Sequence, residues 1–498
     1  MRSVMQHEFS RAPQGNIPRS SFDRSHGHKT TFDAGWLIPV YVDEALPGDV
    51  FRMRVRIFAR LATPLYPIMD NAKIDIHFWS VPKRLLWDNF KKFCGEQDDP
   101  SDSIDFTIPS RTVTPTEGSL SDYFGLPIGN ALSGINDLFY RAYNFIYKEH
   151  YRDQNLQDSP VITTGDSASS ISGYPLRRRG KRHDYFTSCL PWPQKGDAVD
   201  LPLGTQAPVK GVGAESTLLS IANDTTGDNR ILDLADASHV GWDTASGTGA
   251  SLYADLSTAT AATINQLRES FQVQRLLERD ARGGTRYAEV VQSHFGVEFQ
   301  DVRYRPEYLG GGSADVIINP VAQTAEGTTN AEVGHLAAIG TASGAAGFTK
   351  AFDEHCVLMG IASVRADLTY QQGIERMWSR STRYDIYWPA LSRIGEQAVL
   401  NKEIYADGSA NDDLVFGYQE RYAEYRYKPS RISGLYRSDA TGSLDAWHLS
   451  QDFASLPVLG DTFIQEDPPF DRVIAVSSEP HFLFDSFFDL RCARPMPL

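Results

Sequence analysis

Cysteine is scarce in this sequence, and its pattern excludes several kinds of protein. Only four cysteines occur in 498 residues, far apart at Cys94, Cys189, Cys356 and Cys492. There is no CxxC pair and no Cys/His cluster with the spacing of a zinc site. Scattered cysteines in so long a chain are typical of free thiols in a reducing compartment. We therefore expect neither a disulfide framework nor a metal site.

Long apolar runs and an excess of positive charge are also missing. No stretch approaches the ~18 apolar residues of a membrane-spanning helix, and the opening residues, MRSVMQHEFS, contain no apolar signal core. We expect a soluble protein without a membrane span. Lys and Arg number 48 against 63 Asp and Glu, a net charge of −15. Such a field repels nucleic acid at long range, so any contact needs local basic patches or a basic partner.

The sequence motifs of catalysis are absent as well. There is no phosphate-binding GxxxxGK[ST], no GxSxG nucleophile elbow and no HExxH. The glycine run at residues 310–312 is not followed by a helical pattern, so it is weak evidence for phosphate binding. We predict no catalytic residue and no cofactor. A carboxylate pair assembled from distant segments, as in glycosidases, stays open at this point.

Residues 51–61, FRMRVRIFARL, have the clearest pattern of the chain. A period of two over eleven residues indicates a half-buried β-strand. The apolar face carries Phe51, Met53, Val55, Ile57, Ala59 and Leu61; the other face carries Arg52, Arg54, Arg56 and Arg60, with Phe58 as the one apolar break. Cations about 7 Å apart repel by ~0.6 kcal/mol per pair in water. The arginine face therefore needs anions nearby.

Two basic-aromatic patches could contact single-stranded nucleic acid, because aromatic rings stack on bases while cations meet phosphates. The first lies within residues 421–437 and contributes the candidates Tyr425, Arg426, Tyr427, Lys428 and Arg431. Its alternative is a subunit interface, where Tyr and Arg are also enriched. The second is the run Arg177, Arg178, Arg179, Lys181 and Arg182. Its alternative is a solvated loop paired with the acids of a neighbour.

The remaining chain divides by composition. We predict helices over residues 133–150 and 263–282 from their apolar periodicity. Residues 384–388 and 473–476 read as strands, and the Gly/Ala/Thr-rich residues 310–350 as a loop. Residues 197–262 are acidic and small-residue-rich, which is typical of a surface insertion. It contains Asp224, Asp228, Asp233, Asp236, Trp242 and Asp243, which the family resemblance described next makes candidates for facing a receptor.

Long blocks of the sequence resemble one family. They include SHGHKTTFDAG (25–35), ARLATPLYPIMDN (59–71), RGKRHDYFTSCLPWPQKG (179–196), SVRADLTYQQGIERMWSRSTRYDIYWPAL (363–391) and FGYQERYAEYRYKPS (416–430). These blocks are similar to the major capsid protein of gokushoviruses, small tailless single-stranded-DNA bacteriophages of the Microviridae. The resemblance covers most of the chain. None of its blocks falls within residues 197–262, where that family carries a variable insertion at the threefold axes.

The resemblance implies a mainly β fold, an eight-stranded antiparallel viral jelly roll with long inserted loops and a few α-helices. It implies pentamers and a T=1 icosahedral shell around a circular single-stranded DNA genome. The implied partners are an internal scaffolding protein, a small basic DNA-binding protein and a bacterial host receptor that meets the insertion. The protein would then reside in the virion, assembled in the host cytoplasm, and would not be an enzyme.

Three regions follow from this interpretation: residues 1–196 and 263–498 as one composite capsid domain, and 197–262 as its insertion. The apolar face of residues 51–61 should line the interior of the jelly roll. For the arginine face, we expect protein carboxylates, from this chain or a neighbour, rather than packaged phosphate. The competing hypothesis for the whole protein is a jelly-roll carbohydrate-binding or carbohydrate-active protein, motivated by 11% aromatic residues and the acid surplus.

Overall fold

The computed structural model describes most of the chain. The described residues are 17–97, 99, 101–103, 105–197, 199, 209–210, 213–215, 218–222, 229–236, 239–242, 253–254, 264–297, 304–324, 334–392 and 394–496. The chain forms two compact units. Residues 1–193 with 285–498 make the first unit, and residues 194–284 make the second. The predicted insertion, residues 197–262, lies within the second unit.

One half of the main sheet combines early and late strands of the chain. β21 (Phe482–Arg494) pairs antiparallel with β2 (His26–Phe32) on one side and with β4 (Val50–Leu61) on the other. β1 (Ser20–Asp23) continues along the end of β21, and β15 (Leu336–Ala351) pairs with the free edge of β4. We call the strands β2, β21, β4 and β15, in this order, the first sheet.

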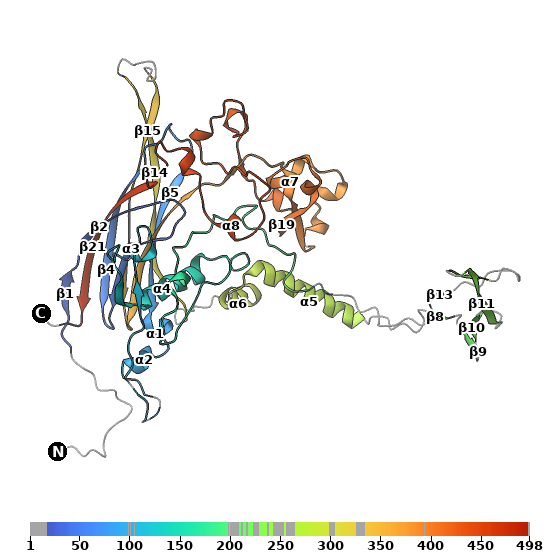
Figure 1. Ribbon diagram of the computed structural model, residues 1–498, viewed down its shortest axis with the longest axis horizontal. Helices are drawn as coiled ribbons and strands as arrows, with labels where there is room; N and C mark the ends of the chain where they lie inside the picture. Colours follow the sequence, from blue (N-terminus) through green and yellow to red (C-terminus); the bar gives the residue numbers. More distant parts are fainter. Residues whose placement is uncertain are drawn as a thin grey trace. The chain divides into compact units, whose positions relative to one another are not determined.

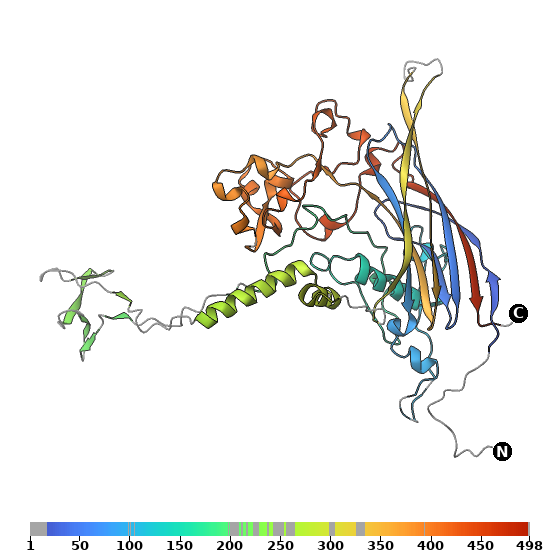
Figure 2. The same ribbon diagram turned by 180° about the vertical axis from the view of Figure 1, so that it is seen from behind.

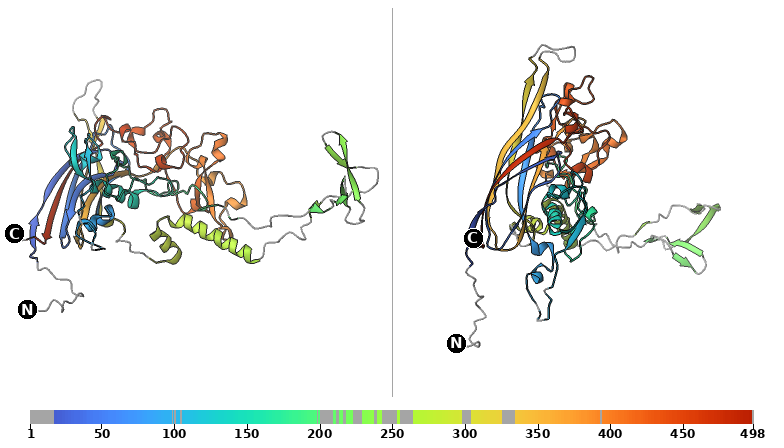
Figure 3. Two further views of the ribbon diagram at one scale, coloured as in Figure 1. Left: turned by 60° about the horizontal axis from the view of Figure 1, so that its bottom comes forward. Right: turned by 60° about the vertical axis from the view of Figure 1, so that its left-hand side comes forward.

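The other half, which we call the second sheet, has the order β14 (Glu307–Ala322), β5 (Ala72–Pro82), β16 (Cys356–Ala366) and β3 (Ile38–Ala45). All of its pairings are antiparallel. The ends of β14 and β15 pair with each other, which joins the halves into one curled sheet. This hairpin extends beyond the other strands (Figures 1 and 2), and Figure 3 shows the curvature from two further sides.

The core of the jelly roll lies between the two sheets. Tyr41 of β3 packs on Phe488 of β21 with ring centroids 5.2 Å apart, and Phe78 of β5 packs on Phe348 of β15 at 5.4 Å. All four side chains are buried and belong to one apolar cluster. Each large side chain fully buried in this way contributes roughly 1.5–3 kcal/mol. The predicted eight-stranded jelly roll is confirmed, with β1 as a short addition.

The second sheet is buried on both faces. α1 (Lys83–Leu86), α2 (Phe90–Phe93) and α4 (Leu138–Ile146) pack on its outer face, where Trp79 and Met359 join an apolar cluster with Trp87 and Tyr143. This double burial explains why β16 is an almost continuous apolar run, whereas β21 alternates between buried and exposed residues. The two sheets therefore differ in what covers their outer faces.

The remaining elements are short. In the first unit they are β6 (Ser110–Val113), α3 (Leu120–Tyr123), β7 (Leu132–Asn136), α6 (Tyr287–Phe295), β17 (Thr369–Tyr370), β18 (Glu396–Leu400), α7 (Asn401–Ile404), β19 (Val415–Glu420), β20 (Ser430–Arg431) and α8 (Asp461–Ile464). In the second unit, β9 (Gly213–Glu215), β10 (Leu218–Ala222), β11 (Asn229–Asp236) and β12 (His239–Trp242) form one small sheet, and β8 (Val209–Lys210) pairs with β13 (Tyr253–Ala254). The long helix α5 (Ile264–Gly283) confirms the helix predicted over residues 263–282.

β4 confirms the strand predicted over residues 51–61. Its burial alternates without a break from Phe51 to Leu61. Phe51, Val55 and the other apolar residues of one face line the core between the sheets. The arginines and Phe58 lie on the opposite, exposed face of the first sheet.

Several local predictions were wrong. Residues 310–350 are mostly the strands β14 and β15, not a loop. Their small residues allow close packing: a Cβ on Gly347 would lie 2.3 Å from the Met53 carbonyl oxygen, and one on Gly312 would lie 2.9 Å from Ala346 Cβ. The helix predicted over residues 133–150 begins only at Leu138, because residues 132–136 pair with β6. Residues 384–388 and 473–476 form no strand.

Candidate nucleic-acid interface

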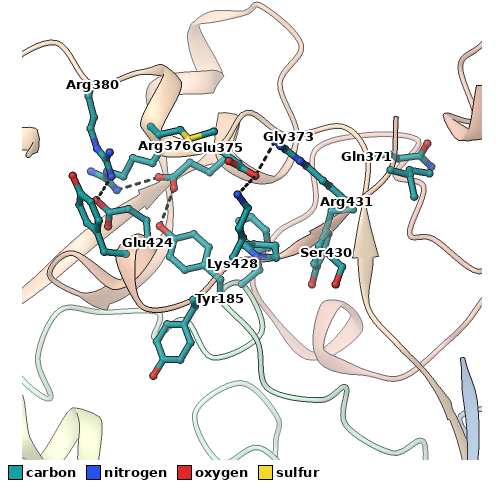
Figure 4. Close-up of a pocket in the computed structure, with 18 of the residues that line it drawn as sticks. Tyr185, Gln371, Gly373, Glu375, Arg376, Arg380, Glu424, Lys428, Ser430 and Arg431 are labelled. Atoms are coloured by element: carbon teal, nitrogen blue, oxygen red, sulfur yellow. Dashed lines mark hydrogen bonds and ion pairs between the residues drawn. The ribbon is translucent and has the colours of Figure 1, made fainter. Parts of the chain in front are cut away.

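The predicted patch at residues 421–437 forms one wall of a cavity of about 250 Å³ in the first unit (Figure 4). β20 contributes Ser430 and Arg431 to this wall and pairs in parallel with β17. The opposite wall comes from residues 371–380, which include a 3-10 turn at Arg376–Trp378. A third apolar cluster, which includes Tyr185, Phe186 and Tyr370, supports the cavity.

Glu403 forms the polar floor of the cavity. Its side chain is almost fully buried, and its carboxylate accepts hydrogen bonds from Tyr185 Oη (2.8 Å), Arg376 Nη1 (3.1 Å) and the Leu400 amide (3.0 Å). Burial raises the pKa of Glu403, and the charge of Arg376 opposes this rise. This buried carboxylate and its three donors tie the wall at residues 371–380, through Arg376, to Tyr185 and Leu400. Its capacity to accept hydrogen bonds is largely used within the protein.

The cations at the mouth of the cavity have acidic partners from the chain itself. Glu375 lies 2.8 Å from Arg431 Nη1 and 3.9 Å from Lys428 Nζ. Arg426, which is not among the residues that line the cavity, pairs with Glu420. These exposed pairs hold their partners weakly, by about 0–1 kcal/mol each. A phosphate could therefore displace the carboxylates, but the patch presents less net positive charge than its sequence indicates.

The aromatic residues of the patch are partly available. Tyr425 and Tyr427 each expose 50% of their surface. The guanidinium of Arg380 lies 4.2 Å from the ring centre of Tyr425, a cation–π contact, and 3.3 Å from a carboxylate oxygen of Glu424. Tyr422 begins this turn with φ of +64°, held by hydrogen bonds from its amide and hydroxyl. Tyr427 is thus the ring with the most open face for a base or a neighbouring side chain.

The second predicted patch, Arg177–Arg182, is tied into the body of the first unit. Its backbone pairs with residues 464–466, and Arg179 Nη1 lies 2.7 Å from Asp75 Oδ2 and 2.6 Å from Ser363 Oγ. Arg365 lies 2.7 Å from the same carboxylate. Burial alone would raise the pKa of Asp75, but the charge of Arg179, a hydrogen bond from Ser313 and the charge of Arg365 together lower that pKa. Arg179 therefore neutralises a buried acid of its own chain.

The other members of this run also have partners in the chain. The contacts are Lys181 with Gln451 (3.2 Å), Arg178 with Asp467 (2.6 Å), Arg182 with Asp367 (3.0 Å), and Arg177 over the ring of Tyr147 (5.3 Å). Arg179 and Lys181 are buried, so neither presents its charge at the surface of this structure. Arg182, with 51% of its side chain exposed, is better placed to meet a phosphate. DNA contact by this run stays a prediction.

The backbone pairing of the second patch also buries a glutamate. Glu466 donates its amide to the Arg179 carbonyl at 2.7 Å, and its carboxylate accepts from the Ala366 amide at 3.2 Å. Burial raises the pKa of Glu466 to about 7, against the opposing effects of that hydrogen bond and of Lys181. Its other carboxylate oxygen has no hydrogen-bond partner among the described residues. Sequence reasoning did not single out this group.

The predicted receptor-facing residues are only partly within the described chain. Asp224, Asp228 and Asp243 lie outside the described residues. Asp233 and Asp236 lie in β11, and Trp242 lies in β12, which pairs antiparallel with β11. The described part of the chain contains no group of three or more His, Cys, Asp or Glu side chains that could hold a metal ion. None of its helices is long and apolar enough to cross a membrane.

The acids that define the cavity were missed at the level of sequence. Glu375, Glu403 and Glu424 are spread over 50 residues, and each meets a cation from another segment. For Glu375 and Glu424 the sequence signal is the alternation of acids and arginines in GIERMWSR and ERYAEYRYK, whereas Glu403 lies in neither segment. That alternation indicates ion pairing but does not identify the partners.

Comparison with known proteins covers the whole chain. Residues 10–498 match the capsid protein (F protein) family. The chain is 46% identical to capsid protein VP1 of Bdellovibrio phage phiMH2K, over 99% of this chain and 96% of the relative. It is 42% identical to capsid protein VP1 of Chlamydia phage 1 (100% and 97%) and 34% identical to that of Spiroplasma virus 4 (99% and 96%).

Proposed function

Because the chain belongs to the capsid protein (F protein) family, it is a structural protein of a virus shell, and we propose that it forms pentamers of a T=1 icosahedron. The resemblance to gokushovirus capsid proteins is confirmed by relatives matched over nearly their full length. A capsid protein is a component of the virion and not an enzyme. The carbohydrate-binding alternative has no support from these relatives.

An exposed apolar surface supports self-assembly. Trp378, Tyr384, Ile386, Tyr387 and Trp388 expose between 43% and 72% of their surface. Large contiguous apolar patches on a single chain mark protein–protein contacts, and aromatic residues dominate such contacts energetically. We assign this patch, residues 374–391, to contacts between neighbouring copies in the shell.

The assembly proposal is tested by the sedimentation of purified protein. Expressed together with an internal scaffolding protein, or isolated from virions, wild-type chains should sediment as pentamers or shells. Trp378→Ser with Ile386→Ser should leave the fold intact by circular dichroism but shift the protein to slower species. Leu435→Ser, at an exposed apolar residue outside the patch, is the matched control. A wild-type protein that stays monomeric under both conditions would overturn the proposal.

The contents of the shell follow from the same proposal. The enclosed genome is circular single-stranded DNA, and a small basic DNA-binding protein supplies cations that a chain of net charge −15 lacks. Assembly takes place in the cytoplasm of a bacterial host. Replacing Arg426 and Lys428 by Gln should lower the DNA content of shells without preventing their formation. Loss of the shells themselves would instead assign residues 421–437 to a subunit interface.

Residues 197–262 are the proposed attachment element for the host cell. Their acidic, small-residue-rich sequence supports an exposed and variable tip. Replacing residues 205–255 by a short Gly/Ser loop should leave particles intact by electron microscopy while adsorption to host cells falls. Unchanged adsorption by such particles would contradict the attachment role.

A further inference from the structure

The outer face of the first sheet carries a row of arginines that no part of the described chain covers. On β4 this face presents Arg52, Arg54, Arg56 and Arg60, all exposed, with Phe58 exposed by 51%. On the neighbouring β21 it presents Arg491, Asp485 and Asp489, together with Leu483 and Phe487, which are exposed by 52% and 49%. We call this surface the arginine face.

The cations of the arginine face differ from those of the cavity in their pairing. None of the four β4 arginines forms an ion pair or a side-chain hydrogen bond within the described part of the chain. By contrast, Arg426, Lys428 and Arg431 of the patch at residues 421–437 each have a glutamate partner. Of the protein carboxylates expected on this face, from this chain or a neighbouring one, the described residues of this chain supply none to these four arginines, and partners from a neighbour stay a prediction. Its charge is left for an external anion.

The register of the sheet sets the layout of the charges and rings. Asp489 lies opposite Arg54, and Phe487 lies opposite Arg56 and diagonal to Phe58. Lys29 of β2 already pairs with Asp485 at 3.0 Å. Successive arginines are about 7 Å apart along the strand because alternate residues face the same side. Cations and two aromatic rings therefore interleave on one face of the sheet.

β15, which pairs with the other edge of β4, carries small side chains beside the arginines. Opposite Phe58, Arg56, Arg54 and Arg52 it presents only small side chains, and the surface is hollowed beside Arg52 and Arg54. These are Ser343, Ala345, Gly347 and Thr349. Long guanidinium side chains next to a floor of small residues make a shallow channel that runs along the strand.

We infer that the arginine face binds single-stranded nucleic acid, with phosphates on the arginines and bases on Phe58 and Phe487. Each nucleotide of a single-stranded nucleic acid offers one negatively charged phosphate and one unpaired base. The arginine face carries partners for both, because its arginines can meet phosphates and its two aromatic rings can stack on bases. A duplex hides its bases and leaves both rings without partners. The inference rests on the proposed function in one respect: in an assembled shell, the bound single-stranded nucleic acid is the packaged genome.

The binding test uses the purified chain and a fluorescent oligo(dT) of about 20 nucleotides, with anisotropy measured over a range of salt concentrations. Arg54→Gln with Arg56→Gln should weaken binding roughly 10–30-fold at 0.1 M salt and reduce the log K against log[salt] slope by about 1.4, because each phosphate contact of a single strand contributes ~0.7. Phe58→Ala should weaken binding while leaving the slope unchanged, since stacking releases no counterions.

The matched control is Lys91→Gln with Lys402→Gln, which removes the same charge from exposed pairs on α2 and α7. If the arginine variant and this control bind oligo(dT) alike, the inference is wrong. If the arginine variant loses shell formation while its oligo(dT) binding stays at the wild-type level, the face is a protein interface and the inference is also wrong. Failure of wild-type chains to form shells would refute the assembly proposal but leave this binding test intact.

Discussion

Replacing Glu466 by glutamine should remove a component of stability that depends on pH. The pKa of Glu466 is raised to about 7 in the folded protein, from 4.5 for an exposed glutamate, chiefly by burial. Between these two pH values the folded chain holds a proton that the unfolded chain releases. The stability from this group is therefore fully present below pH 4.5, falls as the pH rises to 7, and changes no further above it.

The magnitude follows from the size of the pKa shift. Each unit corresponds to about 1.4 kcal/mol, so the wild-type protein should lose ~3 kcal/mol of unfolding free energy between pH 4.5 and pH 8 from this group. Glu466→Gln keeps an oxygen that accepts the Ala366 amide but cannot ionise. Any constant change caused by the amide, including its effect on Lys181, cancels when the two pH values are compared.

The assay is urea unfolding of the unassembled wild-type and variant chains at pH 5, 6, 7 and 8, followed by tryptophan fluorescence. The stability of the variant relative to wild type should rise from pH 5 to about pH 7 and level off between pH 7 and pH 8. Glu479→Gln, at an exposed glutamate, should show no such trend. A constant difference between wild type and Glu466→Gln from pH 5 to pH 8 would refute the raised pKa.

Three further substitutions test the packing. Asp137→Ala removes the carboxylate partner that lies 2.7 Å from the buried Arg141. It should lower the unfolding free energy of the first unit by about 3–5 kcal/mol, measured by urea unfolding. Asp137→Asn should lower that free energy by less. Gly35→Ala should lower the melting temperature, because its φ is +82° and the new Cβ would lie 2.1 Å from the Glu466 carbonyl oxygen. Ile74→Ala, at a fully buried core position, should lose roughly 2–5 kcal/mol of unfolding free energy, and a loss below 1 kcal/mol would contradict the described core.

The fold was predictable where a single residue pattern reports burial directly. The alternation of residues 51–61 predicted both the strand and its buried face. The resemblance, rather than any local pattern, predicted how the strands join into a jelly roll. β14 and β15 were missed because Gly and Ala usually indicate loops; here they are required by contact with the adjoining strand, as at Gly347. A scale of secondary-structure propensities considers each residue alone and does not include its contact with an adjoining strand.

The candidate site was predictable in residue type but not in pairing. Four of the five predicted residues of this patch line one cavity, and Arg426 does not; the four are Tyr425, Tyr427, Lys428 and Arg431. Their partners come from other segments: Glu375 meets Arg431, and Asp75 meets Arg179 from about 100 residues away. Such pairings depend on tertiary contacts that no sequence window contains. For the same reason, the absence of a covering segment over the β4 arginines was visible only in the structure.

The central position of β21 in the first sheet has a consequence for synthesis. β2 pairs with this strand, and β4 pairs with it on one edge and with β15 on the other, so β2 lacks its β21 partner, and β4 lacks one of two, until residues 482–494 have been made. At 5–20 residues per second, translation from Phe32 to Arg494 takes on the order of 20–90 s. Throughout that interval Phe32 lacks its ring contacts with Phe482 and Phe484, and β4 lacks the strand along one of its two edges. Nascent chains thus have prolonged exposure to aggregation, and chaperones that hold these strands would raise the yield of chains competent to assemble.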